Sequence, residues 1–121
     1  MAARGRDRRQ RAERRGRLAE WLAALMLLCR GYRILAMRHR TPLGEIDLIA
    51  RKGDLAVFVE VKARAGEREA LDAVGAAAAR RIRAASEIWL SHQPDAARLS
   101  SRYDIVAVRP LAWPTHYPDA F

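Results

Sequence analysis

Residues 44–49 read Gly-Glu-Ile-Asp-Leu-Ile, and residues 57–62 read Val-Phe-Val-Glu-Val-Lys. Both segments are rich in β-branched and large apolar side chains, which favour strands. Between them, Lys52-Gly53-Asp54 has the composition of a tight hairpin turn. The stretch therefore predicts a β-hairpin with strands at Glu45–Ala50 and Leu55–Lys62.

Successive side chains of a strand point to opposite faces of the sheet. If the apolar rows of the two strands face the same core, Asp47, Glu60 and Lys62 lie together on the other face. Paired carboxylates are typical ligands of Mg²⁺ or Mn²⁺, and a nearby lysine can hold a water or stabilise a developing anion. Glu45 shares this face and is a candidate further ligand. The alternative is a solvated strand edge, where Glu60 and Lys62 form a surface pair worth under ~1 kcal/mol.

A first helix is expected over residues 17–30, ended by Gly31. Its buried stripe is predicted from the apolar side chains that recur every three or four residues: Leu18, Trp21, Leu22, Leu25, Leu28 and Cys29. Glu20 lies away from this stripe, and burying a carboxylate alone is costly. It is therefore a candidate metal ligand, direct or through water, or the partner of an arginine in the N-terminal segment.

The remaining pattern predicts a strand at 32–39, a long helix at 69–91 and a last strand at 103–108, followed by an irregular tail. The order is then α-β-β-β-α-β. Three strands in a meander, a crossover helix and a fourth strand indicate a mixed sheet flanked by helices, a single-domain α/β fold.

The charge is concentrated at the N-terminus of this 121-residue chain. Its formal net charge is +9, and eight arginines precede Leu18. Residues 1–15 are expected to form a basic, flexible arm, and residues 16–121 the folded domain. The arm is either a nucleic-acid-binding element or a solvated extension.

The sequence also argues about compartment and membrane. A single cysteine excludes an internal disulfide framework and a Cys-x-x-Cys zinc site, and it fits the reducing cytoplasm. The apolar run at 18–29 contains Glu20 and is shorter than the ~20 residues that cross a bilayer, so no membrane partner is expected. Cys29 is predicted to lie in the core, and the three histidines are predicted to be ordinary surface or loop residues.

Further motifs occur in order from about residue 16 to the end: Gly16-x-x-x-Glu20-x-x-Ala23, Gly31-Tyr32-x-Ile34-Leu35, the hairpin itself, Arg102-Tyr103-Asp104-Ile105-Val106 and Asp119-Ala120-Phe121. Together they resemble the bacterial YraN-like family. That family is grouped with the restriction-endonuclease-like, or PD-(D/E)XK, nuclease superfamily, and its core resembles that of Holliday-junction resolvases. The resemblance implies a restriction-endonuclease-like αβββαβ core.

The superfamily's Asp…Glu-x-Lys signature would fall on Asp47, Glu60 and Lys62, and its first-helix acid on Glu20. Val61 would offer its carbonyl as a third metal oxygen. The chain departs from the family at Ala78, where members usually carry a lysine, and Arg80 or Arg81 would replace that charge. Phosphate contacts are expected from four arginines, each of which is otherwise a solvated residue: Arg64, Arg80, Arg81 and Arg83.

Three functions remain open at this point. The first is a Mg²⁺- or Mn²⁺-dependent endonuclease that hydrolyses phosphodiester bonds of branched or repair-intermediate DNA. The second is a nucleic-acid-binding module with little turnover, and the third is a protein-interaction domain. A resolvase-like enzyme would also be expected to form a homodimer, but no feature of the sequence fixes an interface.

Overall fold

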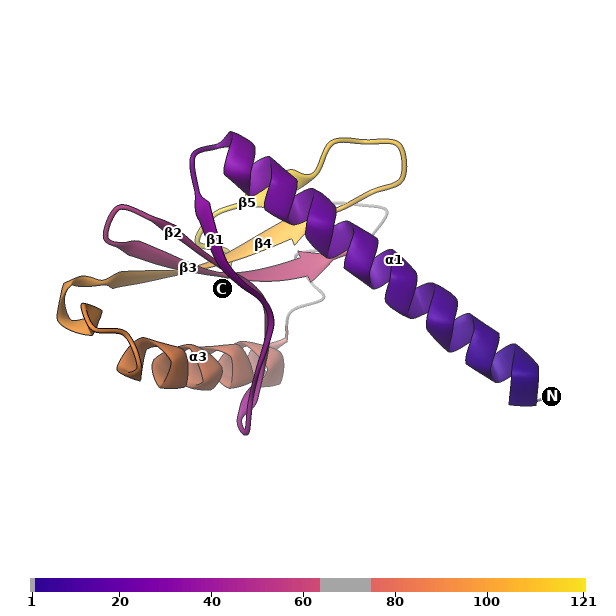
Figure 1. Ribbon diagram of the computed structural model, residues 1–121, viewed down its shortest axis with the longest axis horizontal. Helices are drawn as coiled ribbons and strands as arrows, with labels where there is room; N and C mark the ends of the chain where they lie inside the picture. The colour runs from indigo at the N-terminus through magenta and orange to yellow at the C-terminus, as the bar shows by residue number, and fades with distance from the viewer. Residues whose placement is uncertain (1, 64–74) are drawn as a thin grey trace.

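The computed structural model describes residues 2–63 and 75–121 (Figure 1). The described elements are the helices α1 (Ala2–Cys29) and α3 (Ala76–Ser91), a short 3₁₀ helix (Ala96–Arg98), and the strands β1 (Arg33–Thr41), β2 (Gly44–Lys52), β3 (Leu55–Lys62), β4 (Ser100–Ala107) and β5 (Thr115–Tyr117). No helix among these residues combines the length and the apolar character needed to span a membrane.

The five strands form one mixed sheet in the order β1-β2-β3-β4-β5. β1, β2 and β3 form an antiparallel meander, β3 and β4 are parallel, and β5 is antiparallel to β4. A parallel neighbour requires a crossover, and α3 lies in that connection. The predicted α/β class and αβββαβ order are therefore confirmed, and the strand at Leu55–Lys62 has the predicted bounds.

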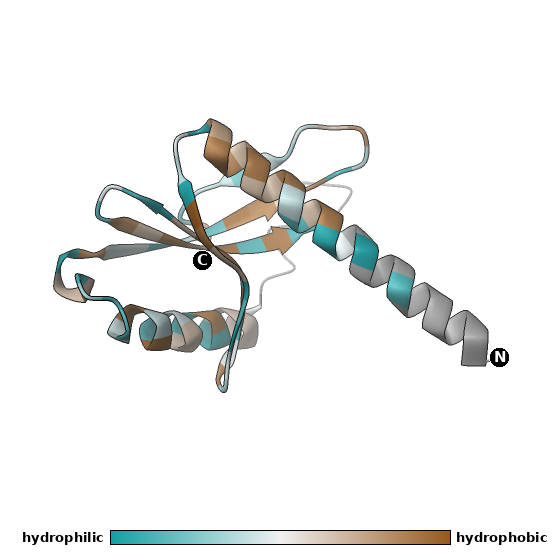
Figure 2. Cartoon of the chain, viewed as in Figure 1, coloured by the Kyte–Doolittle hydropathy of each residue, from teal (hydrophilic) through white to brown (hydrophobic). Residues whose placement is uncertain are grey.

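The two helices cover opposite faces of the sheet (Figure 1). On one face α1 packs against Leu48, Val57, Val59 and other small or branched side chains. On the other face α3 contributes Ile82, Ala85 and Trp89 to a cluster around Phe58. Figure 2 shows the apolar strand centres between the two layers. Full burial of one such side chain contributes about 1.5–3 kcal/mol, so both layers stabilise the strands that carry the candidate site.

The predicted buried stripe of the first helix is wrong. Leu18, Trp21, Leu25 and Leu28 are 59%, 64%, 48% and 53% exposed, and Cys29 is exposed too. The buried face is the other one, formed by Ala19, Ala23, Ala24, Met26 and Leu27. Both sides of this helix are apolar, so periodicity alone could not choose between them. Small alanines let the helix axis approach the sheet closely, which favours this side.

The first helix also begins earlier than expected. α1 runs without a break from Ala2, so the arginine-rich segment continues the core helix. It projects beyond the sheet as a rod (Figure 1). The second predicted helix is described from Ala76 onward, and its predicted start at 69–74 lies outside the described residues.

The C-terminal tail contains a strand that the sequence analysis missed. β5 pairs with β4 through Val106 and His116. The His116 side chain is only 3% exposed and its Nε2 lies 2.6 Å from Oδ2 of Asp104. The expectation of a surface or loop role for this histidine is therefore wrong. Asp104 also forms a salt bridge with Arg102, whose Nη2 lies 2.7 Å from Oδ2.

Candidate active site

The site lies where β2 and β3 separate. Their backbone register runs from Lys52↔Leu55 to Leu48↔Val59 and stops there. Beyond it, the Val61 N–H donates to Oδ2 of Asp47 at 2.8 Å. The Asp47 carboxylate thus takes the place of the backbone carbonyl of β2 that would accept the next hydrogen bond from β3.

The separation of the two strands changes the face of the sheet on which one apolar residue of β2 packs. Leu48 and Ala50 pack under α1 as expected, but Ile46 packs into the cluster under α3. The beginning of β2, at the open end of the β2–β3 hairpin, therefore lies against α3. Gly44 permits this approach, because a Cβ there would lie 3.1 Å from the Arg81 carbonyl oxygen. Any side chain at this position would push the hairpin away from α3.

Asp47 and Glu60 come close enough to affect each other's charge. Burial raises the pKa of Asp47, and the negative charge of Glu60 raises it further, to about 7. The Val61 N–H and Lys62 act in the opposite direction but do not compensate. Near neutral pH the two carboxylates are therefore a site that favours an added positive charge, either a proton or a metal ion.

Asp47→Asn is expected to stabilise the metal-free protein at pH 8. The pKa of Asp47 is about 7 when folded and about 3.9 when unfolded. Its ionisation therefore costs folding free energy, and stability falls as pH rises from about 4 to 7. Removing the charge should recover on the order of 2–4 kcal/mol at pH 8 and little at pH 4. Urea unfolding in EDTA at both pH values measures this, and equal stability of the two proteins at pH 8 would contradict it.

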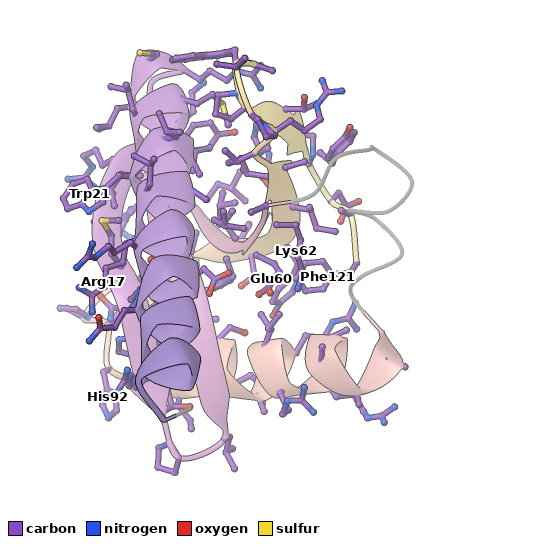
Figure 3. All side chains as sticks on the ribbon, turned by 90° about the vertical axis from the view of Figure 1, so that its right-hand side faces the viewer. Arg17, Trp21, Glu60, Lys62, His92 and Phe121 are labelled. Carbon is purple, nitrogen blue, oxygen red and sulfur yellow. The ribbon has the colours of Figure 1, made fainter. Side chains whose placement is uncertain are left out.

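Lys62 forms an ion pair with Glu60, with Nζ 3.0 Å from Oε1. The two side chains are only 21% and 18% exposed. A pair at this depth does not match the solvated strand edge that was the alternative interpretation. Both residues point into the space between α1 and α3 (Figure 3).

Glu20 is buried on α1 and is near enough to Asp47 to raise its pKa. Its Oε2 accepts a hydrogen bond from Arg38 Nε at 2.7 Å. The partner that the structure describes for this acid is thus an arginine of β1. Arg38 has φ +53, which is uncommon for a non-glycine residue. Sequence reasoning missed Arg38, because the apolar alternation of its strand is weak.

A cleft of about 350 Å³ opens beside the two carboxylates. It is lined by residues of the hairpin and of α3: Glu45, Asp47, Glu60, Ala78, Arg81 and Ile82. Glu45 is exposed, and its Oε2 lies 3.6 Å from Nε of Arg40, which is exposed as well. Its ion pair is therefore a surface contact at the edge of the cleft. Ala78, the position where the family lysine is missing, lies on the same wall as Arg81.

The four predicted phosphate-binding arginines have different surroundings. Arg81 lines the cleft, and Arg80 is exposed on α3. Arg83 lies over the Tyr103 ring, 5.4 Å from its centroid. Arg64 lies outside the described residues. Of the three that are described, Arg81 has the position best suited to a ligand in the cleft.

The donor set fits a hard divalent cation in part. Val108 N–H donates to the Lys62 carbonyl at 2.8 Å, so that carbonyl faces β4. Carbonyls alternate along a strand, so the Val61 carbonyl faces the Asp47 side, as its own N–H does. Two carboxylates and one carbonyl are oxygen ligands of the kind Mg²⁺ and Mn²⁺ take. Within residues 2–63 and 75–121 no three Asp, Glu, His or Cys side chains form a ready ligand set.

Comparisons with known proteins extend this picture. The family model described as "Uncharacterised protein family UPF0102" matches residues 19–108. The chain belongs to the UPF0102 family. A UPF0102 protein of Rhizobium etli (strain CIAT 652) is 67% identical over 113 residues, covering 93% of each chain. One from Mesorhizobium japonicum is 60% identical over 121 residues, covering all of this chain and 97% of the relative.

The part that matches the UPF0102 model has a clear boundary. It includes Glu20, Asp47, Glu60 and Lys62, and it omits most of the arginine-rich half of α1. The candidate site thus belongs to the portion that defines the family.

Proposed function

We propose that this UPF0102 protein is a Mg²⁺- or Mn²⁺-dependent nuclease that hydrolyses phosphodiester bonds of DNA in the bacterial cytoplasm. The observation that carries the proposal is the buried Asp47 carboxyl, whose pKa is raised by burial and by the neighbouring Glu60, beside the Lys62 ammonium that pairs with Glu60. Such a cluster is costly for folding and is typical of a functional site.

Each residue has a distinct proposed role. Asp47 and Glu60 would hold the cation through carboxylate oxygens, with the Val61 carbonyl as a third ligand. When bound, Mg²⁺ or Mn²⁺ lowers the pKa of a coordinated water and offsets charge on the phosphate. Lys62 would position the attacking water or stabilise the developing anion. Glu20, held by Arg38, would contribute through a water, since one of its oxygens already accepts the Arg38 hydrogen bond.

The surface supports a DNA substrate. Arg81 borders the cleft beside Glu60, and the formal net charge of +9 favours a polyanionic partner. The cleft is open along the hairpin, which suits a phosphate within a chain better than an enclosed small molecule. Branched DNA is the preferred expectation, because of the likeness to resolvases stated above.

The test is Mn²⁺- or Mg²⁺-dependent cleavage of linear, single-stranded, flap and four-way-junction DNA. Wild-type protein should cut at least one of these, and Glu60→Gln should not. A second measurement needs no activity: Mn²⁺ should raise the melting temperature of the wild-type protein but not of Glu60→Gln. Glu87→Gln, an exposed acid on α3, is the matched control and should behave as wild type in both.

Each negative result has a definite meaning. A folded protein that binds DNA but neither cuts it nor responds to Mn²⁺ would overturn the nuclease and favour a DNA-binding module. A protein with no salt-dependent affinity for DNA would overturn both and favour a protein-interaction domain.

A further inference from the structure

The outer face of α1 carries a continuous apolar seam, formed by Leu18, Trp21, Leu25 and Leu28. Every one of these side chains is between 48% and 64% exposed. Large apolar side chains usually avoid such exposure when they lie in a row. The inner face of the same helix fills the core, so among the described residues the seam is not part of the packed interior.

The spacing of the seam indicates what covers it. The four residues follow one another at steps of three, four and three, which is the a/d pattern of a coiled coil. This repeat places knobs on one line along a helix, where a second helix packs at 8–10 Å.

The seam faces away from the candidate active site. Trp21 points from one side of α1, whereas Glu60 and Lys62 lie on the other side (Figure 3). A helix packed on the seam would therefore leave the cleft open. This arrangement does not depend on whether the cleft is catalytic.

The exposed apolar surface extends beyond the seam. Next to Leu18, the exposed side chains of Leu111 and Trp113 line an apolar groove with it. Contiguous exposed apolar surface of this kind marks an interaction site.

We propose that the seam is a homodimer interface in which two copies of α1 pack antiparallel about a two-fold axis. An apolar seam is self-complementary, as a two-fold interface requires. With the axis near Ala23, Leu18 faces Leu28 of the second copy and Trp21 faces Leu25.

Charge selects the antiparallel arrangement. Arg14 is exposed and lies four residues before Leu18, so it continues the line of the seam toward the N-terminus. In a parallel pair it would face Arg14 of the second copy, and like charges at such positions are destabilising. In the antiparallel pair the two Arg14 side chains lie at opposite ends of the interface.

The first test is the oligomeric state of the full chain by analytical ultracentrifugation. Wild-type protein should sediment as a dimer at tens of micromolar, whereas Leu25→Glu should sediment as a monomer with an unchanged circular dichroism spectrum. Leu43→Glu is the control. Leu43 is 54% exposed, against 48% for Leu25, but it lies in the turn between β1 and β2. It should remain dimeric. A monomeric wild type, or a dimer that survives Leu25→Glu, would overturn the proposal.

Disulfide trapping tests the orientation. In the antiparallel pair the two Cys29 residues lie about 12 residues apart along the helix axis, roughly 18 Å, which is too far for a disulfide. Under mild oxidation a mixture of Leu18→Cys and Leu28→Cys proteins, each also carrying Cys29→Ser, should cross-link between copies, whereas wild type should not cross-link. Efficient Cys29–Cys29 cross-linking in wild type would instead establish the parallel pair and refute this orientation. Neither test requires cleavage activity, so both would still measure dimer formation if the proposed nuclease function were wrong.

Discussion

Lys62→Ala is expected to lower the rate of Mn²⁺-dependent DNA cleavage by at least about 100-fold. Nζ of Lys62 lies 3.0 Å from Oε1 of Glu60 in the space between the two helices, so its positive charge is adjacent to a proposed metal ligand. Removing it deletes a donor needed where charge develops in the transition state. Binding of DNA should weaken by less than about threefold, because one lysine is a small part of the basic surface. Single-turnover cleavage and fluorescence anisotropy with Ca²⁺ measure the two quantities.

The chain offers a matched control for this variant. Lys52 is the only other lysine and lies exposed at the β2–β3 turn, away from the cleft. Lys52→Ala should cut DNA at the wild-type rate. If the two lysine variants cleave equally well, Lys62 has no role in the chemistry. If Lys62→Ala loses binding and cleavage in the same proportion, Lys62 is a DNA contact instead.

Asp104→Ala is expected to be the most destabilising single change, by about 3 kcal/mol or more. Asp104 is fully buried and accepts hydrogen bonds from Arg102, from His116 and from the Asp119 N–H, all at 2.6–2.9 Å. Without the carboxylate, the imidazole of His116 and the Asp119 N–H lose this acceptor, and the Arg102 guanidinium keeps only the Tyr32 hydroxyl. The melting temperature should fall by about 10 °C or more for a chain of this size. Asp54→Ala, which removes a carboxylate that is 63% exposed, should change it little.

The effect of Asp104→Ala should depend on pH. Burial alone would raise the pKa of Asp104, but the hydrogen bonds from Arg102, His116 and the Asp119 N–H lower it to about 2. A carboxyl whose pKa is lower in the folded state stabilises the protein above its unfolded pKa of about 3.9. That contribution is lost between about pH 4 and pH 2. Urea unfolding should therefore show the wild-type and variant curves approaching each other as pH falls, and a constant difference would contradict this assignment.

The β2–β3 hairpin was predictable because its alternating apolar pattern fits a β-strand and does not fit a helix. Val57 and Val59 alternate with Phe58 and Glu60 in a way that no helix could bury, and Gly53 marks the turn with φ +61. Placing Asp47 beside Glu60 required only that alternation. The pKa of Asp47 was not predictable, because it depends on how closely α1 and α3 cover the sheet.

The helix face was not predictable for a physical reason. Leu25 and Leu27 lie on opposite sides of α1, and both sides contain enough apolar residues to pass for a core stripe. Hydrophobicity favours the leucine-rich side, whereas close packing favours the alanine-rich side. The structure follows close packing, and the leucine-rich side is left for another molecule under the dimer proposal.

The network around Asp104 was missed because its members are far apart in the sequence. Tyr32, Arg102 and His116 come from three separate segments, and the Arg102 guanidinium donates to both Asp104 and the Tyr32 hydroxyl. No local pattern signals such a contact. A lone histidine in a proline-rich tail has the same composition as a loop.

The hydrogen bond between Asp47 and the Val61 N–H bears on how related sequences should be interpreted. Its acceptor is part of the hairpin itself, so selection for folding alone would retain an acid or an amide at position 47 in a relative that had lost all activity. Among the described residues, no backbone hydrogen bond involves the side chain of Glu60 or Lys62. Those two positions are free to drift once chemistry is no longer selected. Under the proposed function, loss of Glu60 or Lys62, and not the presence of Asp47, would therefore mark a family member that has kept the fold without the proposed activity.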